Sequence, residues 1–137
     1  MYSKIVVPVD LAHADRLEKA LSVSADLAKH YQAELHYVGV TSSAPGAVAH
    51  TPEEFAGKLK AFADAQGAAR GVAVRADAVT SPDPTRDLDD TLRRTVDELG
   101  ADLVVMASHV PGFAEHVFAS NAGYLANHAN VSVLVVR

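Results

Sequence analysis

The sequence predicts a single α/β domain built on an open, five-stranded parallel sheet with helices on both faces. Two observations lead to this fold class. Five short apolar runs alternate with longer segments in which apolar residues recur at helical spacing. The chain has 137 residues, of which 49% are hydrophobic and 21% charged, so it is long and apolar enough to bury one core. The alternation of strand and helix then favours right-handed crossovers between parallel strands.

The first strand and helix are predicted at the start of the chain. The run KIVVPV at 4–9 is continuous and β-branched, which is typical of a strand covered on both faces. Beyond it, Leu17 and Leu21 begin an apolar stripe at helical spacing with charged residues between its members. We therefore expect a helix over about 13–31.

The second strand and helix follow in the same order. The run AELHYVGVT predicts a strand over 33–41, and the Ser, Pro and Gly residues of 42–50 predict a loop. Thr51, followed by Pro-Glu-Glu, has the composition of a helix start, because Thr caps, Pro tolerates the first helical position and acids suit the positive end of the dipole. We expect Gly67 to end this helix.

The third strand differs from the others in its pattern. Apolar and polar residues alternate over 71–80, which predicts a half-exposed strand near an edge of the sheet. SPDPT predicts a turn, and Leu88 and Leu92 begin a helical stripe that runs up to a glycine stop at Gly100.

The last part of the chain contains two strands with a helix between them. DLVVMA predicts a buried strand over 102–107, and VSVLVVR predicts another over 131–137. The intervening helix is expected over about 120–129, with Ser120 as its N-cap. An apolar strand at a sheet edge would template aggregation unless it is paired, so we expect a homodimer formed through 131–136.

Composition excludes several classes of function. A formal net charge of −5 argues against a nucleic-acid surface, which needs clustered Lys and Arg. The absence of cysteine excludes disulfides, thiolate chemistry and Cys-based metal sites. No apolar stretch approaches the roughly 20 residues of a membrane span, and the N-terminus does not read as a signal peptide. A cytoplasmic protein is the default expectation.

The expected binding edge follows from the fold class, because ligands of open parallel sheets bind at the carboxyl ends of strands, where strand order reverses. The segments that reach this edge are Asp10, Val38–Thr41, Met106–Pro111 and Ser120–Ala122. Asp10 either bonds a ribose hydroxyl or an adenine edge, or it caps the first helix. The amides at Ser120 either hold a phosphate at a helix N-terminus or form an ordinary cap.

No catalytic constellation is apparent. The seven histidines form no metal-binding motif such as His-Glu-x-x-His, so no metal site is expected. No serine lies in a Gly-x-Ser-x-Gly elbow. The adjacent acids Asp89 and Asp90 are interpreted as the solvated face of a helix.

Across its whole length the chain resembles the universal stress proteins, a family with a flavodoxin-like, adenine nucleotide alpha hydrolase-like three-layer fold. The resemblance rests on KIVVPVD at the start, ELGADLVVMASH before the last loop and SNAGYLANHANVSVLVVR at the end. Nucleotide-binding members carry Gly-x-x-Gly, nine residues, and then Gly-Ser or Gly-Thr. Here Ala107, Val110 and Ala119 stand at the three glycine positions, and the spacer is one residue shorter.

The chain is more similar to a subgroup with Ser-His-x-Pro in the loop and Ser-Asn-Ala in the helix, which is associated with adenine nucleotide. SHVP at 108–111 and SNA at 120–122 match this pattern. The resemblance implies a binding site for ATP or AMP. The loop holds no Lys or Arg, so Mg²⁺ or the helix dipole would offset the phosphate charge. The implied site residues are Pro8, Val9, Asp10, Val40, Met106, Ala107, His109, Val110, Pro111, Ser120, Asn121 and Ala122.

Three functions remain open at this point. The first is a regulatory module that responds to ATP or AMP and recruits an unknown protein partner through its loops. The second is a nucleotide-free, dimeric partner-binding protein. The third is a slow ATP hydrolase, for which the sequence offers neither a positioned base nor an arginine finger.

Overall fold

The structure, a computed structural model, describes residues 1–108 and 115–137, apart from the side chains of Thr85 and of residues 115–121. This part of the chain contains one sheet of five parallel strands in the order β3-β2-β1-β4-β5. The strands are β1 (Lys4–Pro8), β2 (Glu34–Thr41), β3 (Val74–Thr80), β4 (Leu103–Ala107) and β5 (Ser132–Val136). The fold class predicted from the sequence is confirmed.

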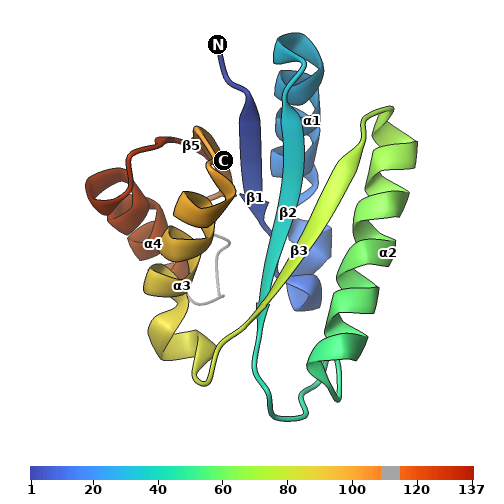
Figure 1. The fold of residues 1–137 in the computed structure, drawn as a ribbon, viewed down its shortest axis with the longest axis vertical. Coiled ribbons are helices and arrows are strands. Elements are labelled where there is room, and N and C mark those ends of the chain that lie inside the picture. Colours follow the sequence, from blue (N-terminus) through green and yellow to red (C-terminus); the bar gives the residue numbers. More distant parts are fainter. Residues whose placement is uncertain (109–114) are drawn as a thin grey trace.

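Helices cover both faces of this sheet (Figure 1). They are the 3₁₀ helix η1 (Leu11–Arg16) and the α-helices α1 (Glu18–Tyr31), α2 (Pro52–Arg70), α3 (Pro84–Leu99) and α4 (Glu115–His128). One core cluster packs side chains of α1 and α2 against β1 and β2, and it contains the buried Tyr37. The other packs α3 and α4 against the opposite face around Val38 and Met106.

The edge position agrees with the sequence pattern for β3 but not for β5, whose apolar run is that of a buried strand. The alternating strand β3 lies at one edge of the sheet, as predicted, and the apolar strand β5 lies at the other. On β5, Leu134 is 37% and Val135 45% exposed, so this edge carries apolar side chains at the surface. β3 exposes Arg75 instead, which makes it the more polar of the two edges.

The helix that follows β1 begins later than predicted. Asp10 caps the short helix η1 by accepting a hydrogen bond from the amide of Ala12, and the backbone then kinks at His13, where φ is −131° and ψ is 32°. The expected helix over 13–31 is therefore two elements. Apolar spacing alone does not detect this break, because the stripe begins at Leu17.

The predicted cap of α2 is confirmed and its predicted end is wrong. The hydroxyl of Thr51 accepts a hydrogen bond from the amide of Glu54 at 3.0 Å. The helix runs through Gly67 to Arg70, and Gly71 ends it with a φ of 69°. Gly67 is needed for packing, because a Cβ there would lie 2.6 Å from the backbone oxygen of Val72.

The two remaining helices start earlier than predicted. α3 begins at Pro84, capped by Asp83, so part of the expected SPDPT turn is helical, while Gly100 ends the helix as predicted with a φ of 71°. α4 begins at Glu115 and not at Ser120. Ser120 therefore lies inside the helix and is not its N-cap.

Candidate functional site

The carboxyl ends of β1 and β4 form the point at which strand order reverses. From β1 the chain continues to β2 on one side, while the later strands β4 and β5 lie on the other. The ladder between β1 and β2 has five paired positions, whereas that between β1 and β4 has two, Ile5–Leu103 and Val6–Val104. Pairing between β1 and β4 thus stops before Pro8, which has no N–H to donate. Beyond Val6 and Val104 the ends of these two strands are therefore not paired with each other.

The predicted residues of β1 lie at this point. Pro8 and Val9 are buried, and the amide of Val9 donates to the carbonyl of Val38 at 2.8 Å, which ties the end of β1 to β2. Asp10 is the next residue, and its side chain is 40% exposed. A carboxylate at this position is accessible from solvent while its backbone is anchored in the sheet.

Asp10 makes two short local contacts. One oxygen, Oδ1, accepts the amide of Ala12 at 3.0 Å, and the other, Oδ2, lies 2.7 Å from Nδ1 of His13. The capping role considered for Asp10 is therefore observed. An ionised carboxylate has about four acceptor sites, so a cap does not prevent ligand binding. The contact with His13 was missed from the sequence, although the Asp-x-x-His spacing was there to suggest it.

The predicted residues of β2 and β4 flank the same edge. Val40 is half-buried and packs against the α3–α4 core cluster, near the end of β2. Met106 is 1% exposed in that cluster, and Ala107 is half-buried on the opposite face. The end of β4 is held to β5 by the amide of Ser108, which donates to the carbonyl of Val136 at 2.6 Å.

The loop after β2 is bonded to itself. The hydroxyl of Ser42 accepts the amide of Ala44 at 3.1 Å, and the amide of Gly46 donates to the carbonyl of Ala49 at 2.9 Å. The ammonium group of Lys58 on α2 bonds the carbonyl of Val48. These contacts hold the loop against the start of α2, at the end of the sheet where the short helix η1 also lies (Figure 1).

The remaining predicted residues lie in or after the last loop. His109, Val110 and Pro111 fall outside the described residues, as do the side chains of Ser120 and Asn121. Ala122 is 8% exposed and packs in the α3–α4 core cluster. Only the first four amides of a helix lack an intrahelical partner. Since α4 starts at Glu115, the amides of 120–122 are not among them, and the expected phosphate contact through these amides does not follow from the helix start.

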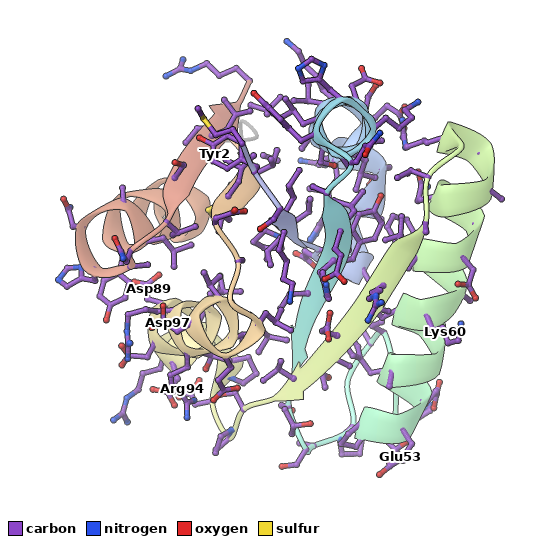
Figure 2. All side chains as sticks on the ribbon, turned by 45° about the horizontal axis from the view of Figure 1, so that its top comes forward. Tyr2, Glu53, Lys60, Asp89, Arg94 and Asp97 are labelled. Atoms are coloured by element: carbon purple, nitrogen blue, oxygen red, sulfur yellow. The ribbon has the colours of Figure 1, made fainter. Side chains whose placement is uncertain are left out.

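The adjacent acids of α3 differ from each other. One carboxylate oxygen of Asp90 accepts the hydroxyl of Tyr124 on α4 at 2.6 Å. Asp89 lies on the side of α3 that turns toward α4 (Figure 2), and its Oδ1 is buried without a hydrogen-bond partner among the described residues. Burial raises the pKa of the Asp89 carboxyl, and the charge of Asp90 raises it further. The interpretation of both acids as a solvated face was wrong for Asp89.

Histidines serve as hydrogen-bonding groups elsewhere in the fold. His36, 4% exposed, lies between Asp77 and Glu34, and His128 lies 3.0 Å through Nδ1 from the carbonyl of Tyr124. Among the side chains that the structure describes, those of residues 1–84, 86–108 and 122–137, no three His, Asp or Glu side chains are grouped so as to hold a metal ion. Within the same ranges, no helix has the length and apolar character needed to span a membrane.

Comparisons with known proteins agree with this architecture. A profile of the universal stress protein family matches residues 1–137. Universal stress protein G of Shigella flexneri is 30% identical over an alignment that covers all of both chains. A universal stress protein solved in complex with cAMP superposes with a TM-score of 0.73 at 20% identity, covering 99% of this chain and 97% of that one. The universal stress protein of Archaeoglobus fulgidus in complex with dAMP gives a TM-score of 0.67 at 22% identity, covering 99% and 98%. The chain belongs to the universal stress protein family.

Proposed function

We propose that this protein binds an adenine nucleotide at the carboxyl edge between β1 and β4 and acts as a nucleotide-responsive regulatory module in the stress response. The observation that carries the proposal is the position of Asp10, a half-exposed carboxylate just beyond the end of β1, where β1 and β4 are no longer paired. Open α/β sheets bind nucleotides outside the carboxyl ends of their strands, where strand order reverses. Relatives of the same fold were solved with cAMP and with dAMP, which supports an adenine ligand.

The chemistry of the edge fits a nucleoside. Asp10 offers acceptor sites for sugar hydroxyls, and the half-buried Val40 offers an apolar surface for a base. In the proposed site Pro8, Val9, Asp10 and Val40 contact adenosine. The backbone at Met106 and Ala107 and the residues His109, Val110 and Pro111 line the phosphate path, and Ser120 and Asn121 complete it from α4, whereas Ala122 packs in the core cluster beneath it.

The phosphate groups of the ligand carry negative charge that the site must compensate. Residues 107–122 contain neither Lys nor Arg. In the proposal Mg²⁺ therefore enters with the triphosphate of ATP and is held mainly by its oxygens, as is usual for Mg²⁺ bound with nucleotide. AMP, which carries less charge, needs no metal. This difference makes the dependence of ATP affinity on Mg²⁺ a direct readout of how the phosphates are held.

The first experiment is to denature the purified protein and identify released small molecules by mass spectrometry. Adenine nucleotide near one equivalent per chain would support the proposal. Titration calorimetry with AMP and with Mg-ATP then tests the site. Asp10→Ala should weaken binding about tenfold or more through loss of charge-assisted hydrogen bonds, whereas the control Asp64→Ala, on the outer side of α2, should not. An empty protein that binds neither nucleotide would refute the proposal.

A second candidate function is favoured by the exposed edge strand. Leu134 and Val135 on β5 are 37% and 45% exposed, at an edge whose backbone groups are unpaired on one side. Pairing of two copies through 131–136 would cover this edge. A dimer of this kind could present its loops to a protein partner without any nucleotide. Nucleotide-free protein that still captures the same partner as nucleotide-loaded protein would favour this second function.

A further inference from the structure

We infer that His13 is a positioning residue for the ligand: it holds the carboxylate of Asp10 in the orientation that accepts the two neighbouring hydroxyls of a ribose. The inference rests on the proposed function and adds a specificity to it, namely preference for a nucleotide with both the 2′ and the 3′ hydroxyl.

Both oxygens of the Asp10 carboxylate are held by groups of η1. Oδ1 accepts the amide of Ala12 at 3.0 Å, and Oδ2 lies 2.7 Å from the imidazole Nδ1 of His13. The second distance is at the short end for a nitrogen–oxygen hydrogen bond and is typical of a bond to a charged group. Two anchors on different oxygens restrict rotation of the carboxylate plane, which a single capping bond would leave free.

The backbone of η1 is shaped to make the second contact. His13 departs from helical geometry, with φ at −131° and ψ at 32°, and its amide donates to the carbonyl of Asp10 at 3.0 Å. His13 is therefore bonded to Asp10 through both its backbone and its ring. The ring remains 29% exposed and the carboxyl 40% exposed, so the pair lies at the surface of the edge where a ligand can reach it.

Part of the hydrogen-bonding capacity of the Asp10 carboxylate remains for a ligand. Of about four acceptor sites on the two oxygens, contacts with described residues occupy one on each oxygen, which leaves one on each for a ligand within the described part of the chain. Two adjacent hydroxyls can each donate to one of these oxygens, in the same two-pronged way in which a carboxylate meets other paired donors. A ligand with no hydroxyl at these carbons gains nothing from the fixed orientation.

Substitution of His13 should lower the affinity for nucleotides that carry both ribose hydroxyls. The wild-type protein should bind ATP about tenfold or more tightly than 2′,3′-dideoxy-ATP, because two hydrogen bonds to a charged group are lost. In His13→Phe, which keeps a ring but removes the donor, this ratio should fall toward one. In His13→Asn the side-chain amide can place a donor near the position of Nδ1, and the ratio should be largely restored.

Calorimetry with ATP and 2′,3′-dideoxy-ATP on these three proteins tests the inference, with His30→Phe, an exposed histidine of α1, as the matched control. Thermal unfolding of each variant separates a loss of fold from a loss of selectivity, since only the ratio of two affinities is compared. A His13→Phe variant that keeps the wild-type ratio would overturn the inference and leave the proposed function intact. Wild-type protein that binds neither nucleotide would overturn both.

Discussion

Nδ1 of His36 on β2 lies 2.7 Å from Oδ2 of Asp77 on the adjacent edge strand β3. His36 is 4% exposed, and its other ring nitrogen lies 3.4 Å from Glu34. The hydrogen bond to His36 is the largest cause of the lowered pKa of Glu34, with smaller contributions from Lys4 and Arg75. A buried histidine is thus satisfied on both nitrogens by carboxylates, and it links the edge strand to the centre of the sheet.

Replacing this histidine with an apolar residue should destabilise the fold. In His36→Leu, Asp77 loses its donor while its side chain remains only 30% exposed, which we expect to cost about 1–3 kcal/mol of unfolding free energy. Urea denaturation followed by circular dichroism measures the change. Lys60→Ala removes the exposed ion pair with Asp64 on the outer side of α2 (Figure 2) and should change stability by less than about 1 kcal/mol. A His36→Leu variant as stable as wild type would show that packing replaces the hydrogen bond to Asp77 at no cost.

Two glycines of α2 should respond to the same substitution with opposite sign. A Cβ at Gly67 would lie 2.6 Å from the carbonyl oxygen of Val72, whereas one at Gly57 would meet nothing within 4 Å. We expect Gly57→Ala to stabilise the protein by about 0.5–1 kcal/mol and Gly67→Ala to destabilise it by about 1–3 kcal/mol. Thermal and urea unfolding of the two variants measures the change in stability caused by each substitution. Equal effects at the two positions would contradict the packing role of Gly67.

Asp102 should make stability depend on acidity. Burial alone raises the pKa of this carboxyl, but the amides of Lys4 and Ser3 and the hydroxyl of Ser3 donate to it and together hold its pKa below the usual value. Because the folded pKa is lower than the unfolded one, the stabilisation is present above about pH 4 and is lost as pH falls through the folded pKa.

The corresponding variant gives a measurable pH signature. Asp102→Asn should lower the unfolding free energy by about 1–2 kcal/mol at pH 7, and the difference from wild type should shrink as the pH falls below about 4. Asp97→Asn supplies the control, because Asp97 on α3 is 50% exposed beside Arg93. A constant difference between Asp102→Asn and wild type across this range would rule out the ionised carboxylate as the source of the stabilisation.

The exposed edge strand should control oligomeric state. Val135→Lys places a charge on β5, which natural sheet edges use to prevent pairing, so we expect the proposed dimer to become a monomer. Light scattering after size exclusion at tens of micromolar measures the mass. Ala61→Lys adds the same charge to an exposed position of α2 and should leave the mass unchanged. Wild-type protein that is already monomeric at this concentration would show that β5 is not a dimer interface.

Much of the fold could be predicted from local patterns. The five strands, the cap at Thr51 and the stop at Gly100 follow from side-chain periodicity and from interactions that span three or four residues. The wrong predictions of helix ends arise because these patterns report only on residues close together in the sequence. Gly67 has the composition of a helix end, but the helix continues past it, and its lack of a side chain serves a contact with Val72 beyond that end. Ser120 has the composition of a cap but lies inside α4.

The candidate site, too, could be predicted only in part from the sequence. The sequence placed Asp10 at a strand end, and resemblance to a family gave it an expected ligand. The partnership of Asp10 with His13 depends on a kink that periodicity does not reveal, and the role of His109, Val110 and Pro111 remains a prediction from the sequence.

By itself the sequence determined the order and kind of the elements and the family, because these depend on short-range spacing and on the chain as a whole. Only the tertiary structure decided which strand ends meet, where pairing between β1 and β4 stops, and which groups surround His36. The physical reason is that side chains 41 residues apart, such as His36 and Asp77, become partners only through strand order and register. Neither is encoded in the local pattern of one strand.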